Sequence, residues 1–195
     1  MKISWGLPPL RPGILGKIDK FIGPGATTAE KQIQFFPPLA LAVGVVAFGL
    51  VKQVEWTIWQ YAVVAILAVD MFGGVLTNAT SAAKRWYFRE GEGFKQHMTF
   101  VALHLAQPAM FSWAFLDFNL LWIAGVYGVL LTGSAIILRS PLYLQRPVAA
   151  MIYVLTLFLS LYIFETAPYL EWFLPVLFFK ILISHALREE PYQPE

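Results

Sequence analysis

Six long apolar runs constrain the fold of this chain more than any other feature of its sequence. Each run is close to the length that crosses roughly 30 Å of hydrocarbon as an α-helix, and none alternates as a barrel strand would. Hydrophobic residues make up 58% of the sequence and charged residues 13%, outside the range of an ordinary soluble domain. The runs comprise residues 35–51, 56–80, 96–115, 120–138, 147–164 and 169–187. We therefore predict an all-α integral membrane protein with six transmembrane helices.

The basic residues lie almost entirely on one side of these runs. Twelve of the fourteen Lys and Arg residues fall before the first run, after the last run, or in the loops after the second and fourth runs. Loops rich in Lys and Arg stay in the cytoplasm, so we expect both termini inside. The other three loops are short, comprising residues 52–55, 116–119 and 165–168. Because short connections force antiparallel neighbours, the spans should form three antiparallel hairpins.

We expect one membrane domain with two cytoplasmic ends: an arm at 1–34, the six-helix domain at 35–188 and a tail at 189–195. The chain has no cysteine, which excludes disulfides, thiolate metal sites and thiol catalysis. The net charge of +2 is small, so the basic excess reflects topology and not a nucleic-acid surface. The expected partners are membrane lipids, a second copy of the chain or a larger membrane complex. The compact loops favour a bacterial inner (plasma) membrane.

The N-terminal arm carries a short amphipathic pattern. Ile14, Ile18 and Phe21 recur at helical spacing, while Lys17 and Lys20 fill the other face. Such a helix lies in the membrane interface with its lysines toward anionic headgroups. Thr27 followed by Glu30 matches a capping box, which predicts a second short helix before the first span.

Three spans place an ionisable side chain at similar depth. With a rise of 1.5 Å per residue, Asp70 lies roughly 15 Å, His104 roughly 12 Å and Lys180 roughly 10 Å from the cytoplasmic ends of their spans. Ionisable groups in hydrocarbon are costly, so each needs a partner or a role. In a structural interpretation, Asp70 pairs with Lys180 or His104 and holds the three spans together.

A functional interpretation places a polar cavity here, opening to the cytoplasm with Asp70 and His104 at its base. Gly73 and Gly74 leave room beside Asp70. The residues expected to bind or orient a substrate are Thr77, Asn78, His97 and Lys180. Because the basic loops would form the rim of this cavity, we expect it to favour anionic substrates or headgroups.

Three classes of function fit such a layer. In the leading hypothesis, Asp70 and His104 are the acid–base pair of an intramembrane enzyme that acts on a lipid or apolar substrate from the cytoplasmic leaflet. In the second, protonation of Asp70 switches a proton-coupled carrier of a small solute, with Lys180 as counter-charge. In the third, the chain is an accessory subunit of a membrane complex, and the layer is structural.

A metal site is a further hypothesis. Histidine and carboxylate ligands without thiolate suit zinc or iron, and His185 and Glu189, four residues apart, form the best local pair. His97 and His104 are about 10 Å apart along a helix, too far to share one ion easily. A bis-histidine haem would need His97 and His185 at like depth, near the membrane edge.

Overall fold

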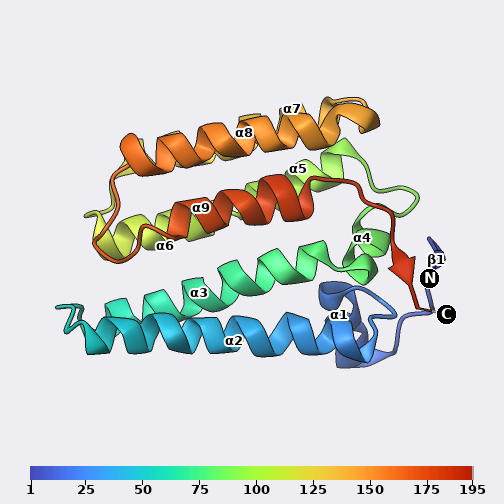
Figure 1. Cartoon of the computed structure of the whole chain (residues 1–195), viewed down its shortest axis with the longest axis horizontal. Helices are drawn as coiled ribbons and strands as arrows, with labels where there is room; N and C mark the ends of the chain where they lie inside the picture. Colours follow the sequence, from blue (N-terminus) through green and yellow to red (C-terminus); the bar gives the residue numbers. More distant parts are fainter. Residues whose placement is uncertain (195) are drawn as a thin grey trace.

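The computed structural model describes residues 1–194, which are helical apart from turns and one short strand pair. Figure 1 shows the helices running along the long axis of the molecule, with both chain ends at the same end of it. Strand β1 (Lys2–Ile3) pairs antiparallel with β2 (Tyr192–Gln193) and joins the two ends. The helices are α1 (Gly13–Ile22), α2 (Thr28–Val51), α3 (Ile58–Ala79), α4 (Ser81–Tyr87), α5 (Phe94–Leu103), α6 (Ala106–Phe115), α7 (Leu120–Arg139), α8 (Leu142–Tyr162), α9 (Phe173–Phe178) and the π-helix η1 (Phe179–His185).

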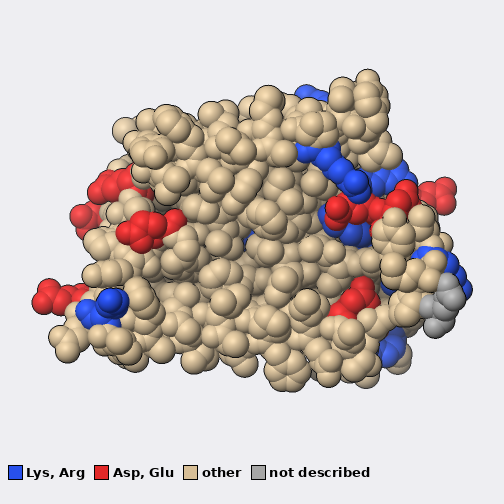
Figure 2. Space-filling model, in the orientation of Figure 1, with Lys and Arg blue, Asp and Glu red and all other residues tan. Residues whose placement is uncertain are grey.

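Four helices are long and apolar enough to cross a membrane, namely α2, α3, α7 and α8. They expose large apolar side chains such as Leu121 (87%) and Ile58 (78%). Soluble monomers rarely expose contiguous apolar surface of this kind. Figure 2 shows charged side chains gathered at the two ends of the molecule, with a broad uncharged band between them. These features indicate a membrane protein, and they correspond to four of the six predicted spans.

Helix α2 begins earlier than the apolar pattern predicted. The predicted capping box is confirmed: the Thr27 hydroxyl accepts from the Glu30 amide at 3.1 Å, and the Glu30 carboxylate accepts from the Thr27 amide at 2.8 Å. The expected separate short helix is wrong, because α2 continues through Pro37 and Pro38. Helices in a membrane tolerate proline where neighbouring groups satisfy the freed carbonyls.

The predicted third run is divided into α5 and α6. The helix stops at His104, whose backbone angles (φ −79°, ψ 11°) are not helical. Pro108 explains the break, since a proline has no N–H to donate and its ring clashes with the carbonyl four residues earlier, that of His104. The Tyr127 hydroxyl of α7 donates to the Ala102 carbonyl beside the break. His104 therefore lies at the interruption between α5 and α6, four residues before Pro108.

The predicted sixth run is also irregular. It begins at Phe173 as the short helix α9 and continues as η1, in which the Ala186 amide bonds to the Ile181 carbonyl five residues earlier. π-helical segments are rare and occur frequently at functional sites. Both Lys180 and His185 lie in this segment.

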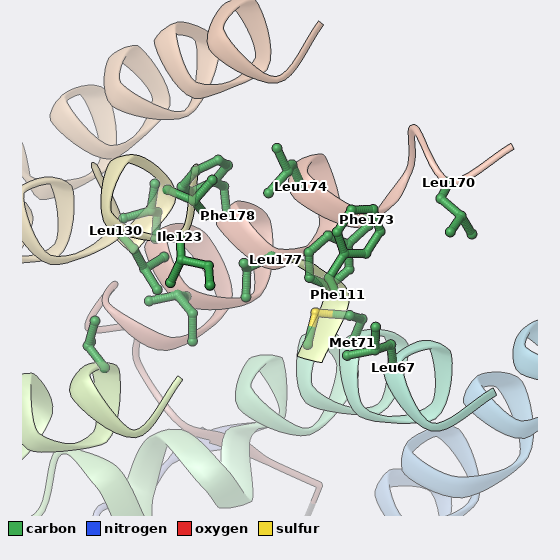
Figure 3. Packing of buried hydrophobic residues seen from close by; sticks show 14 of the residues in the cluster. Leu67, Met71, Phe111, Ile123, Leu130, Leu170, Phe173, Leu174, Leu177 and Phe178 are labelled. Carbon is green, nitrogen blue, oxygen red and sulfur yellow. The ribbon is translucent and has the colours of Figure 1, made fainter. Parts of the chain in front are cut away.

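The hydrophobic core joins α3, α6, α7 and α9. In Figure 3 the rings of Phe111 and Phe173 lie face to face beside Met71, and their centroids are 4.3 Å apart. The Trp122 ring of α7 also stacks with Phe111, with centroids 5.5 Å apart. All four side chains are almost completely buried. This aromatic stack fixes α6 and α9 against α3, which positions the polar residues farther along the same helices.

The N-terminal arm is attached to α4 by Glu30 and by α1. Beyond its role in the capping box, Glu30 accepts a bond from the Ala82 amide at 3.0 Å. Ile22 of α1 packs with Ala82 of α4. The backbone at Gly23, where φ is 88°, passes so close that a Cβ would lie 2.3 Å from the Ala82 carbonyl carbon. Ile14, Leu15, Ile18 and Phe21 stay exposed.

Replacing Glu30 with alanine should release the arm. The Glu30→Ala variant loses the carboxylate half of the capping box and the bond to Ala82, so we expect the free energy of unfolding to fall by about 1–2 kcal/mol. Limited proteolysis should then cut the chain before α2 faster than in the wild type. Lys31→Ala is the matched control, since the Lys31 side chain is exposed. Equal proteolysis of the two variants would contradict this role of Glu30.

Candidate functional site

An open groove of about 910 Å³ lies between α2, α3 and α5. Its walls are mostly apolar and include Leu39 of α2, Ile66 and Val69 of α3, and Leu103 of α5. Four polar side chains from different elements line it more deeply; we call them the polar floor, and they are Asp70, His104, Gln107 and Lys180. A cavity with apolar walls and a few convergent polar groups is the usual form of a small-molecule site.

Asp70 is the centre of the polar floor. Its Oδ2 atom accepts from Lys180 Nζ at 2.8 Å and from Gln107 Nε2 at 3.0 Å. The Asp70 side chain is 42% exposed, whereas that of Lys180 is 3% exposed. The structure therefore pairs Asp70 with Lys180, one of the two partners that the sequence predicted. The lysine lies behind the carboxylate, and the carboxylate faces the groove.

Gly74 makes room for this ion pair. A Cβ on Gly74 would lie 2.1 Å from Lys180 Cε and 2.7 Å from Cδ, so the lysine chain crosses α3 directly over this glycine. At Gly73, one residue earlier, a Cβ would meet nothing nearer than Pro38 Cβ at 3.8 Å. The lysine can reach Asp70 because position 74 carries no side chain.

His104 has a defined tautomer. Its Nδ1 atom lies 2.8 Å from the Phe100 carbonyl oxygen, which can only accept, so Nδ1 carries the proton. The Nε2 atom is then a lone-pair acceptor. No group in residues 1–194 donates to it. As a neutral imidazole, the form that burial favours, His104 thus carries an available base beside the groove that it lines.

The predicted substrate-binding residues fall into two places. Thr77 and Asn78 line the groove near the arm, and Lys180 lies in the polar floor. His97 does not line the groove. It lies with His185 in a second cavity of about 250 Å³, separated from the groove by side chains that line both, Tyr87, Phe100 and Leu103.

His97 and His185 form a buried pair. His97 Nδ1 and His185 Nε2 are 3.1 Å apart, and the Phe100 ring stacks on His185 with centroids 3.9 Å apart. The outer nitrogens of the pair, His97 Nε2 and His185 Nδ1, have no hydrogen-bond partner in the described chain. One imidazole donates to the other, which holds α5 against η1.

The predicted metal pair is not assembled into a ligand cluster. Glu189 lies 3.7 Å from Lys84 Nζ. That same ammonium donates to the carbonyls of Ser184 and Leu187 at 2.6 Å, at the end of η1. Burial lowers the pKa of Lys84 to about 8, so the group is mostly protonated at neutral pH. Within residues 1–194, no three His, Asp or Glu side chains come together as a metal site.

Gln107 and Phe100 are the site residues that sequence reasoning missed. Gln107 follows His104 by three residues, so helical spacing would have placed it on the same face. Phe100 precedes His104 by four residues and supplies the carbonyl that orients the imidazole. Neither was identified, because an amide and a phenyl group carry no charge to mark them in an apolar run.

Comparisons with known proteins found no relative of this chain. No protein-family model matches the chain, and neither a curated protein nor a solved structure matches it. The fold and the groove thus define the class on their own: a helical membrane protein with a polar-floored groove among its helices.

A methyl group at position 74 should disrupt the polar floor. Gly74→Ala forces Lys180 away from Asp70, and overpacking of this kind typically costs about 1–3 kcal/mol. We expect a lower thermal unfolding temperature in detergent.

Gly73→Ala is the matched control for this experiment, because the added methyl group has space. Alanine also favours a helix over glycine by up to about 1 kcal/mol, so this variant should be as stable as the wild type or more stable. If both variants melted at the same temperature, Lys180 would not cross at Gly74 as described.

Proposed function

We propose that the chain spans the membrane six times. Helices α5 and α6 follow one another along the long axis, as do α9 and η1, and each pair runs between α3 and the helices α7 and α8 (Figure 1). α5 and α6 pack against α7, and α8 packs against α9 and η1. With α2 against α3, these contacts support three antiparallel hairpins, with both ends in the cytoplasm by the distribution of basic residues. A bacterial inner membrane fits the same topology.

We infer that the groove binds a lipid or another apolar substrate. Its walls continue into the exposed apolar surface: Ile66 is 56% exposed, Leu39 57% and Leu103 71%. A molecule dissolved in the bilayer can therefore enter sideways without crossing water. Phe21 of the arm lines the groove as well, which supports entry near the cytoplasmic leaflet.

The chemistry proposed for this site is acid–base catalysis. The observation that carries it is that His104 Nε2, an unpaired base, and Asp70, a carboxylate held by a lysine, line one groove. His104 would take a proton from the bound substrate, and Asp70 would stabilise the imidazolium that results. Gln107 and Lys180 hold the carboxylate in place for that role.

One observation favours a carrier as the second candidate. The break between α5 and α6 and the π-helix η1 both lie at the polar floor, and interrupted helices around a central site are typical of secondary transporters. Protonation of Asp70 would weaken its bond to Lys180 and free η1 to move. In an accessory subunit the ion pair would hold the helices together and the groove would bind nothing. Binding of a ligand in the groove therefore distinguishes an enzyme or a carrier from an accessory subunit.

Labelling with a photoactivatable hydrocarbon tests the groove. A hexadecane chain with a terminal diazirine, added to the protein in liposomes, should label peptides from α2, α3 and α5 on the groove side. In Gly73→Phe the ring fills the groove, so labelling there should be mostly lost. Gly128→Phe is the matched control, because a side chain at Gly128 meets open space on α7. Equal labelling of both variants would reject a groove-bound substrate.

The variant His104→Gln then distinguishes an enzyme from a carrier. His104→Gln should keep the labelling but lose conversion of a lipid extract, followed by mass spectrometry in liposomes. A carrier would instead give uptake driven by a pH gradient and no conversion. If the wild type is labelled but converts nothing, the enzyme proposal is wrong.

A further inference from the structure

The residues of the polar floor carry hydrogen-bond acceptors that no described group pairs with. The Gln107 amide is oriented by its partner: Nε2 donates to the Asp70 carboxylate, which can only accept, so Oε1 is the remaining atom. Gln107 Oε1 is buried and has no partner in residues 1–194. His104 follows the same logic, because its Nδ1 proton goes to a carbonyl and Nε2 is left as an acceptor.

Asp70 adds a third acceptor. Both donors that reach its carboxylate bond to Oδ2, and no described group bonds to Oδ1. Gln34 repeats the pattern near the arm, where Nε2 donates to the Ile22 carbonyl and Oε1 is buried without a partner. Buried polar atoms are nearly always paired in native proteins, and an unpaired one costs about 1–3 kcal/mol. Unpaired acceptors along one groove point to a ligand that supplies donors.

The charge of the groove restricts this ligand further. Among the described residues that line it, Asp70 and Lys180 carry the charges, and they cancel. A phosphate or carboxylate headgroup would approach the exposed carboxylate of Asp70 in a medium of low dielectric constant, where like charges repel strongly. Such a group also brings no donor for Gln107. The unpaired acceptors and the zero net charge of the groove therefore disfavour anionic ligands, although the basic loops had suggested a preference for them.

We propose that the groove takes a neutral amphiphile with a single chain and a hydroxyl group at its polar end. This rests on the proposed function of the groove. A hydroxyl can donate to His104 Nε2, to Gln107 Oε1 or to Asp70 Oδ1. From Ala65 to Asn78 the groove follows α3 for roughly 20 Å, and its wall beyond Asp70 is apolar, with Ile66 and Leu39. The chain of the ligand would lie along that wall.

Competition among ligands with one tail and different headgroups tests this proposal. Hexadecan-1-ol, hexadecanoic acid and hexadecyl phosphate compete with the diazirine hydrocarbon for labelling of wild-type protein at neutral pH. We expect the alcohol to displace the probe at a concentration about tenfold below that of the phosphate, the effect of about 1.4 kcal/mol. A hexadecyl hydroquinone with the same tail is tested separately. If it is more potent than hexadecan-1-ol, the natural hydroxyl is aromatic; if it is less potent, the natural hydroxyl is aliphatic.

Two variants connect the preference to the polar floor. Gln107→Leu should reduce the advantage of the alcohol over the phosphate, because it removes one of the three acceptors. Gln60→Leu is the matched control, because the Gln60 amide also bonds between α3 and α6, to the Ala114 carbonyl, but lies outside the groove. It should keep the advantage. A preference unchanged in Gln107→Leu would overturn the assignment to the polar floor.

The failure of this inference differs from failure of the proposed function. If the three headgroups displaced the probe equally, or if the phosphate were more potent, the hydroxyl proposal would be wrong while groove binding stood. If the hydrocarbon labelled no groove residue in the wild type, the proposed function itself would be rejected.

Discussion

The bond between Lys180 and Asp70 is the constraint on which the site depends. It joins η1 to α3 across the bare backbone of Gly74. A charge in hydrocarbon is expensive, and a buried pair is tolerated only where its geometry and other hydrogen bonds are good. Gln107 supplies one such bond from α6. The helices α3, α6 and η1, which are distant in sequence, are thereby joined at Asp70, and its carboxylate stays accessible from the groove.

Two irregular helices make this arrangement possible. The helix is interrupted at His104, whose amide bonds to the Val101 carbonyl while its imidazole Nδ1 donates to the Phe100 carbonyl, so Nε2 stays unpaired. The π-helix η1 carries both Lys180 and His185, each directed to a different cavity. Non-helical backbone at membrane depth is tolerated where it is buried in protein or lines a cavity. The aromatic stack of Phe111 and Phe173 supports both irregular segments from the side of the core.

The layer of ionisable residues could be predicted from the sequence, whereas the pairings that depend on distant contacts could not. Depth along six apolar runs placed Asp70, His104 and Lys180 in one layer, and the structure brings the first and last together. The placement of His97 outside the groove was not foreseen, because it depends on the contact with His185, 88 positions away in the sequence. The pairing of Glu189 with Lys84, not with His185, depends on a contact between residues more than 100 positions apart. Local spacing carries no signal for it.

A double-mutant cycle on Asp70 and Lys180 tests the central claim most directly. Asp70→Asn leaves the buried ammonium of Lys180 without its counter-charge, and Lys180→Met leaves the carboxylate without its partner. The account predicts that each single variant unfolds at a lower temperature than the wild type. It also predicts that the double variant loses clearly less stability than the sum of the two single losses. Strictly additive losses would show that the two side chains do not interact, and would contradict the account.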